Sequence, residues 1–344
     1  ALDETAPTAQ IQVGENRWNT FLNSITFGLF FKNIQTVTIS ATDHDSGVEK
    51  TEYFVSETIY QSTEALEEAA DGRWVSYEKA FNITPKSKNI IYAKVTDNVG
   101  NVGYVSSDGI VLYTDATQDT QSISFTKTST ADVNASVNLN GNTISGIYCG
   151  EEALTYGEYY TVNSNTITFK ASWLDTLSAG DHTLTIHYNP MGEEFVNGGG
   201  NVAPATTTIS LSVQKATGSV EITNDISKVY DGQPVSAVTY QASSTGKVTV
   251  EYKVRGTYTP TKPSAVGEYT VRVTVAADDD YNEASATADF AITYLAAPEP
   301  AYTLSGDEGQ NGWYISDVTI TPPNGYTISN ALNGEYSDSL TVNA

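Results

Sequence analysis

Residues 247–254 read KVTVEYKV, and apolar and polar side chains alternate along the whole stretch. Successive side chains of a β-strand point to opposite faces, so the three valines and Tyr252 share one face. The lysines, the threonine and the glutamate between them share the other face. A strand with one apolar and one polar face is typical of a sheet that covers a core on one side and meets water on the other.

The same alternation recurs along the chain, in EYTVRVTV at 268–275, TISLSV at 208–213 and QTVTISA at 35–41. Gly, Asn, Asp and Pro separate such runs, and these residues favour turns. Parallel sheets that are buried on both faces would instead show continuous apolar runs with helices between them. The sequence therefore predicts an all-β chain made of antiparallel β-sandwiches.

Two short helices are expected to interrupt the strands. Residues 63–70, TEALEEAA, begin with a Thr that can cap a helix, and Gly72 follows them as helix ends often require. We expect Thr63 to be the capping residue. Residues 172–177 are long enough for a single helical turn.

The chain is strongly acidic. It has 344 residues, with 41 Asp and Glu against 17 Lys and Arg, so its formal net charge is -24. Such an excess repels polyphosphate backbones and anionic lipid surfaces, and we expect no nucleic acid partner and no adsorption to a membrane. No apolar run approaches the ~20 residues that span a bilayer, so we expect no membrane insertion in this segment. We also expect a monomer.

Strand patterns stop at small or proline-containing links near residues 114–118, 215–218 and 295–300. These links divide the chain into three units in the size range of β-sandwiches and a shorter last unit. The last unit holds about half the strands of an immunoglobulin-type sandwich, and we expect it to be truncated. The expected units are 1–116, 117–215, 216–295 and 296–344.

The first unit carries an Asp-Asn-x-Gly-Asn turn at 97–101 and an exit strand that begins at Ser107. With ATDHDSGVEKTEYFVS at 41–56, these pieces resemble bacterial Ig-like repeats of large exported surface proteins. GWYISDVTITPPNGYTIS at 312–329 resembles the opening of a related repeat.

The second unit carries three ordered motifs: DVNASVNLNGNTISGI at 132–147, LTYGEYYTVNSNTITF at 154–169 and WLDTLSAGDHTLTIHY at 173–188. Together they resemble the Ig-like carbohydrate-binding module of the X-two type. This resemblance implies a module that accompanies secreted polysaccharide-degrading enzymes and cell-surface proteins, as a spacer, a wall-associated module or a sugar binder. A Gly-rich insert at 190–201 departs from the compact form of that family.

The third unit has VYDG at 229–232, AVGEY at 265–269 and ATADFAI at 286–292. It resembles the YDG-type MBG repeat, which implies a surface adhesin or stalk. Taken together, the resemblances imply tandem Ig-like antiparallel β-sandwich domains. They bring no catalytic residues with them.

Histidines and cysteine offer little chemistry. His182 and His187 lie five apart beside one strand, so their side chains should face opposite sides and share no metal. Cys149 is the only cysteine, so no disulfide can form within the chain. We interpret it as a small, semi-buried residue, because no histidine and acid frame it as a nucleophile.

Oxygen ligands gather in turns of the first unit, and such ligands suit a calcium ion. Asp and Asn also cap turns by bonding their own backbone, which needs no ion, and this interpretation is preferred. The residues concerned are Asp43, Asp45, Asp97, Asn98 and Asn101. The acidic run at 278–280 is interpreted as a charged loop, and we expect no bound metal or cofactor.

Two acid pairs, Glu151–Glu152 and Glu193–Glu194, are nominal candidates for glycoside hydrolysis. Adjacent residues of a strand point apart, and nothing in the sequence builds a cleft around them, so we expect no catalytic residue and no enzyme. Lys32 follows the apolar run 27–31 and is the candidate for a cross-link between Lys and Asn. A charged end that reaches solvent is the preferred interpretation of that lysine.

Exposed aromatic rings can stack on sugar rings, but one Trp per sandwich is also what a packed core uses, and we expect burial. The aromatic candidates are Trp18, Trp74, Trp173 and Trp313, near one per unit, and the cluster Tyr156, Tyr159 and Tyr160.

We therefore expect a non-catalytic segment of an extracellular bacterial protein, cell-surface or secreted, that acts as a modular stalk or adhesin spacer. The alternative is a carbohydrate-binding ancillary region that targets a larger glycan-degrading enzyme to polysaccharide or mucin. Cell-wall or host glycans are the candidate partners. An exposed row of aromatics on the second unit would favour the alternative, and the sequence names no ligand residue.

Overall fold

The computed structural model describes residues 2–296, 301–330 and 334–343. They divide into two compact units. The first runs to Ser219 and includes Ser243–Lys247 and Ala276–Ala284, and the second takes the rest of the described chain. Residues 297–300, most of the expected link at 295–300, lie outside the described residues.

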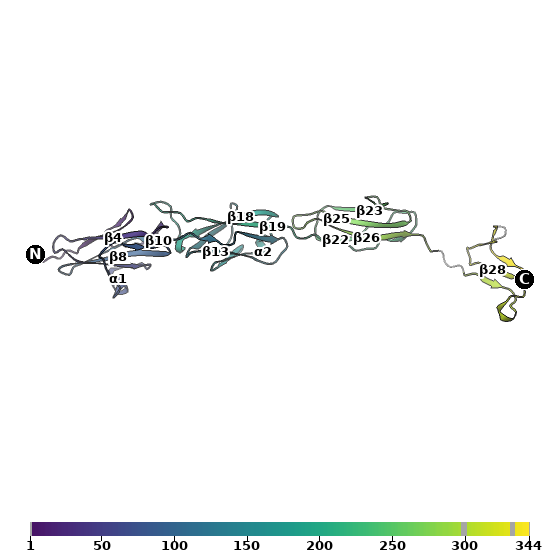
Figure 1. The fold of residues 1–344 in the computed structure, drawn as a ribbon, viewed down its shortest axis with the longest axis horizontal. Coiled ribbons are helices and arrows are strands. Elements are labelled where there is room, and N and C mark those ends of the chain that lie inside the picture. Colours follow the sequence, from purple (N-terminus) through teal and green to yellow (C-terminus); the bar gives the residue numbers. More distant parts are fainter. Residues whose placement is uncertain (1, 297–300, 331–333, 344) are drawn as a thin grey trace. The chain divides into compact units, whose positions relative to one another are not determined.

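The first sandwich packs one sheet of strand order β2-β1-β4-β7 on another of order β3-β10-β8-β5-β6, with β9 beside β8. Figure 1 labels β4 and β8, one strand from each layer. The core between the layers contains the side chains that the alternating pattern predicts, among them Ile11, Val13, Val37, Ile39 and Val95. The strands are β1 (Thr8–Val13), β2 (Asn16–Trp18), β3 (Phe27–Phe31), β4 (Gln35–Thr42), β5 (Val48–Ser56), β6 (Val75–Ser76), β7 (Phe81–Ile83), β8 (Ser87–Asp97), β9 (Val102–Ser106) and β10 (Gly109–Leu112).

Helix α1 (Thr63–Ala70) follows β5 and buries Leu66 and Ala70 against the first sandwich. Its cap is Ser62, whose side-chain oxygen accepts a backbone N–H of the first turn at 3.2 Å. The expectation that Thr63 caps the helix is wrong, because the extended backbone that a cap needs falls one residue earlier. No helix in the described part of the chain has the length and apolarity needed to cross a bilayer.

The second sandwich packs a sheet of order β11-β13-β17-β16 on one of order β12-β19-β18-β14-β15. Helix α2 (Ala171–Leu174) is the single turn that the sequence predicts, and it places Trp173 in the core. The strands are β11 (Thr117–Gln118), β12 (Ser122–Thr126), β13 (Val133–Asn138), β14 (Thr143–Cys149), β15 (Glu152–Ala153), β16 (Tyr160–Asn163), β17 (Thr166–Phe169), β18 (Gly180–Asn189) and β19 (Thr207–Gln214).

The third sandwich has a sheet of order β21-β26-β25-β23-β24 and a pair, β20 and β22. Tyr252, Val271 and Val273 are buried, as KVTVEYKV and EYTVRVTV predict. The strands are β20 (Val220–Ile222), β21 (Lys228–Val229), β22 (Tyr240–Ala242), β23 (Val248–Val254), β24 (Thr257–Thr259), β25 (Gly267–Val275) and β26 (Ala284–Thr293).

The C-terminal segment forms two small sheets, and none of its described residues belongs to a buried core cluster. Its strands are β27 (Thr303–Ser305), β28 (Val318–Thr321), β29 (Ile328–Ser329), β30 (Tyr336–Ser337) and β31 (Leu340–Val342). Short 3-10 turns cover Pro190–Gly192 and Gln310–Gly312.

The chain is a tandem array of Ig-like β-sandwiches, but the sheets are not purely antiparallel. In each of the three sandwiches the described strands include one parallel pair: β3 with β10, β12 with β19, and β21 with β26. In each pair an early strand of the sandwich lies beside its last strand. The expectation of wholly antiparallel sheets is wrong at this edge, because the pairing depends on how the chain closes the sandwich and not on local alternation.

Residues 190–206, called the strap below, connect β18 to β19 and reach the first sandwich within the same compact unit. Phe195 lies edge-on to Phe30 with ring centroids 5.1 Å apart. Asn201 Nδ2 donates to the Gly28 carbonyl at 2.8 Å, and its Oδ1 accepts the Phe30 amide at 2.9 Å. Glu193 pairs with Lys88 at 2.9 Å. The strap therefore ties the first two sandwiches together.

Candidate functional site

A groove of about 580 Å³ opens on the outer face of the second sandwich, between β14, β18 and the strap. The strands supply aromatic and amide side chains, and the strap supplies the opposite wall. The lining residues are Ser145, Tyr148, His187, Tyr188, Asn189, Glu194, Phe195, Asn197, Ala203, Pro204 and Thr206.

Tyr148 and His187 form the aromatic side of this groove. Their rings meet edge to face with centroids 4.9 Å apart. A Cβ on Gly146 would lie 3.3 Å from the Tyr148 ring, so the ring lies across that glycine. The sheet thus presents a tyrosine beside a histidine, and the buried Tyr188, whose pKa burial raises, lies below them.

A β-bulge sets this arrangement. The register of β14 against β18 shifts between Ile144 and Gly146, so Ser145 is the additional residue. Ile144 and Ile147, three positions apart, both pack on the core as a result. Because the bulge changes the alternation, Tyr148 faces outward together with His187.

A second hollow of about 390 Å³ adjoins the groove, and Ser145 lines both. Tyr156 lies there with 65% of its surface exposed, in edge contact with Tyr160 at 5.6 Å. Tyr160 is buried, and Tyr159 stacks on Trp173. Of the predicted tyrosine cluster, Tyr156 alone offers an open ring.

The tryptophans divide between core and surface. Trp173 is buried, and Trp18 and Trp74 pack partly buried against the first sandwich's clusters, as expected. Trp313 is 77% exposed, so the expectation of core packing is wrong there. The C-terminal segment gives that ring no core to enter.

The oxygen-rich turns of the first sandwich lie together. Carboxylate oxygens of Asp3, Asp43 and Asp97 fall within 4.8 Å of one another, and such oxygens could hold a hard cation. Each also accepts backbone N–H groups: Asp43 Oδ1, for example, accepts the Gly47 amide at 2.7 Å. Burial raises the pKa of Asp97, but hydrogen bonds led by those from Asn101 outweigh it and lower the value to about 2. The turn-capping role predicted for Asp43 and Asp97 is therefore present.

No local pattern in the sequence points to Asp3, which lies about forty residues from its nearest partner in the chain. The other predicted ligands divide: Asn101 Nδ2 donates to Asp97 Oδ2 at 2.8 Å, and Asn98 Nδ2 donates to the Ser46 carbonyl at 2.8 Å. Asp45 contributes its backbone amide to Asp43 at 3.1 Å, and its carboxylate is outside the cluster.

The remaining candidates are dispersed. His182 bonds the Ser178 carbonyl at 2.8 Å, whereas His187 lies on the opposite face in the groove, as the spacing predicts. Cys149 is half-buried, and burial raises the pKa of its thiol. Lys32 pairs with Asp115 at 2.7 Å and keeps 29% of its side chain exposed, which favours the solvent-reaching interpretation.

The two acid pairs, which the sequence offered only as nominal candidates for hydrolysis, lie in different segments of the fold. Glu152 is in β15 beside the turn that carries Glu151, and Glu193 and Glu194 lie in the strap. Within the strap, Glu193 is engaged by Lys88 while Glu194 lines the groove. In the loop at 278–280, Asp278 accepts the amides of Asp280 and Tyr281, so it caps that loop.

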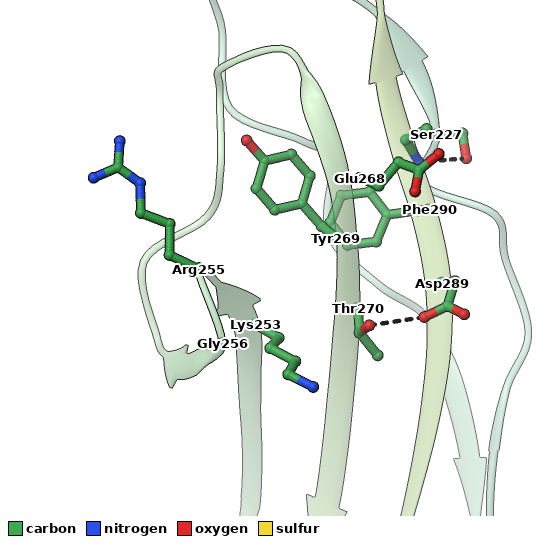
Figure 2. A pocket seen from close by; sticks show the side chains of 10 residues that line it. Ser227, Lys253, Arg255, Gly256, Glu268, Tyr269, Thr270, Asp289 and Phe290 are labelled. Carbon is green, nitrogen blue, oxygen red and sulfur yellow. Dashed lines mark hydrogen bonds between the residues drawn. The ribbon is translucent and has the colours of Figure 1, made fainter.

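A further cleft of about 670 Å³ lies on the third sandwich. Figure 2 shows Lys253 and Arg255 on the side of β23 and its turn, and Glu268 and Asp289 on the side of β25 and β26. The Thr270 hydroxyl donates to Asp289 Oδ1 at 2.7 Å. The cleft thus combines two cations with two carboxylates.

Comparison with known proteins finds a family that the second sandwich resembles. Residues 118–195 match the family of the carbohydrate binding domain X2. The second sandwich is similar to an X2 module. A stretch of 59 residues is also 41% identical to cellulose-binding protein A of Clostridium cellulovorans. The stretch makes up 17% of this chain and 3% of that protein. The matched stretch thus spans only 3% of the length of that curated relative.

Solved structures give weaker similarities. The I-band fragment I67–I69 of titin is 11% identical with a TM-score of 0.37, covering 83% of this chain and 99% of the fragment. A tri-modular GH5 endo-beta-1,4-glucanase from Bacillus licheniformis is 17% identical with a TM-score of 0.24, covering 53% of this chain and 39% of the enzyme.

Proposed function

We propose that this chain is a non-catalytic carbohydrate-binding ancillary region of a larger extracellular bacterial protein. The observation that carries the proposal is the match of residues 118–195 to the carbohydrate binding domain X2. The similarity to cellulose-binding protein A makes polysaccharide the first ligand class to test. This is the alternative that the sequence left open.

The groove of the X2-like sandwich is the proposed binding site. Tyr148 and His187 offer ring faces and edges to the apolar side of a sugar ring, as aromatic residues do at wet interfaces. Asn189, Asn197 and Glu194 supply donors and acceptors for the hydroxyl groups. A groove of this volume with a few polar groups around aromatic side chains fits a small oligosaccharide.

Tyr148→Ala in the full chain tests this site. We expect the variant to lose about five- to thirtyfold in affinity for cello-oligosaccharides, by calorimetry, because one stacked ring contributes on the order of 1–2 kcal/mol. Tyr240→Ala removes a tyrosine from the third sandwich and serves as the control with unchanged affinity. Equal affinity of Tyr148→Ala and the wild type would contradict the groove, and a glycan array without binding by the wild type would contradict the function.

A spacer role for the neighbouring sandwiches is the second candidate, and the strap supports it. The hydrogen bonds of Asn201 with Gly28 and Phe30 hold two adjacent sandwiches in one compact unit. Four expectations stay predictions. They are the division of the chain at residues 116, 215 and 295, the YDG-type assignment of the third unit, the cell-surface or adhesin setting, and the monomeric state. A stiff joint suits a region that positions its partner domain.

Asn201→Ala tests the strap. The Phe30 amide loses its acceptor, and we expect its hydrogen exchange to accelerate about five- to tenfold, since one such bond contributes about 1 kcal/mol. Asn197 lies in the same strap and lines the groove, so Asn197→Ala is the control. This variant should leave the hydrogen exchange of the Phe30 amide unchanged. Unaltered exchange in Asn201→Ala would show that the strap does not hold the joint.

A further inference from the structure

Two cations on the third sandwich have no acidic partner. Lys253 lies near the end of β23, and Arg255 follows in the turn to β24. Across the described residues, neither side chain makes an ion pair or a hydrogen bond. The neighbouring Arg272, in contrast, donates twice to Glu251 at 2.6 and 3.2 Å. These two positive charges lie in a chain whose net charge is -24.

The backbone of Arg255 also has an unusual conformation. Its φ is 52° and that of Gly256 is 86°, so both turn residues are left-handed. Two-residue hairpin turns of this type prefer Asn or Gly at the first position, and other side chains are strained there. The turn itself therefore does not favour an arginine.

The opposite side of the cleft offers acceptors. Glu268 and Asp289 line it, and Thr270 lies between Asp289 and Lys253, on the strand between theirs. Carboxylates in this position accept hydrogen bonds from hydroxyl groups. Figure 2 shows the two carboxylates on one side of the cleft and the two cations on the other.

We propose that this cleft binds a saccharide that carries a carboxylate, such as a hexuronic acid oligomer. A bare inorganic anion would be repelled by Glu268 and Asp289. A neutral sugar would leave Lys253 and Arg255 without a counter-charge. A uronic acid satisfies both sides, because a guanidinium binds a carboxylate through two parallel N–H···O bonds while the ring hydroxyls reach the acidic side.

This site is separate from the groove of the X2-like sandwich and does not rest on the function proposed for it. Calorimetry with a galacturonic acid trisaccharide, using the full chain, tests the proposal. We expect Arg255→Asn to weaken binding about tenfold or more, as loss of a charge-assisted pair does. The melting temperature should stay equal or rise, because Asn suits the turn.

Two controls make the test specific. Lys262→Asn removes a positive charge outside the cleft and should bind as the wild type does. The methyl-esterified trisaccharide keeps the hydroxyl groups without the charge and should bind at least about tenfold more weakly. Tyr148→Ala should leave this affinity unchanged, so the two sites fail or succeed separately.

Any of three results would overturn the proposal. The first is that the wild type does not bind the acidic trisaccharide, and the second is that the ester binds equally well. The third is that Arg255→Asn binds as the wild type does, or loses binding only together with a lower melting temperature.

Discussion

Asp97 links a turn sequence to pH-dependent stability. Its carboxylate accepts the side-chain amide of Asn101 at 2.8 Å and the backbone amides of Asn101 and Val99 at 2.8 and 3.0 Å. These bonds favour the ionised form, so the folded pKa of about 2 lies below the ordinary 3.8. A carboxyl with a lowered folded pKa stabilises the fold above the unfolded value. That contribution disappears as the pH falls from 3.8 towards 2.

We therefore expect the melting temperature of the first sandwich to fall steeply between about pH 4 and pH 2. Asp97→Asn should melt lower than the wild type at neutral pH and should show a shallower fall, so that the two curves converge in acid. Calorimetric scans across this range give both curves. A constant gap between them would mean that the ionisation of Asp97 does not contribute to stability.

Single residues were predictable where the signal is local. The turns at Asp43 and Asp97 follow from Asp and Asn chemistry over four or five positions. Asp3 joins them only through the folded chain. Tyr148 and His187 meet because a bulge at Ser145 changes which face each side chain takes, and strict alternation does not contain that information.

At the scale of elements, the cap of α1 provides a matched pair of variants. Ser62→Ala removes the hydroxyl that accepts the first-turn amide, and we expect a loss of about 1 kcal/mol in the free energy of unfolding of the first sandwich. Thr63→Ala should change it by less than about 0.5 kcal/mol, since Thr63 is already helical. Urea unfolding measures both. Equal losses in the two variants would restore Thr63 as the cap.

The strands themselves could be predicted because burial on one face requires alternation, and the valines of β23 and β25 show it. The parallel edge pairs could not, because β12 and β19 lie more than eighty residues apart and pair only when the sandwich closes. The strap escaped prediction for a similar reason: its Gly-rich sequence indicates a loop, but not the sandwich on which that loop lies.

At the scale of the molecule, the buried clusters show which sandwiches depend on one another. One buried cluster of the first sandwich is formed by Phe30, Val111 and Tyr113. Two partly buried side chains of the strap, Met191 and Phe195, pack against it. The core of the third sandwich shares no residue with the cores of the first two. The first and second sandwiches should therefore be coupled in unfolding, and the third should unfold on its own.

Trp173→Ala tests this coupling. The buried indole packs on Tyr159 and Phe169, and its loss should cost the second sandwich about 3–5 kcal/mol. The first sandwich should then melt lower by a smaller amount, because the strap no longer covers Phe30, while the third keeps its transition. Calorimetry resolves these steps, and Tyr252→Ala in the third core gives the reciprocal pattern. A shift of all transitions together would mean that the cores are one cooperative unit, since separate cores transmit instability only through the residues that they share.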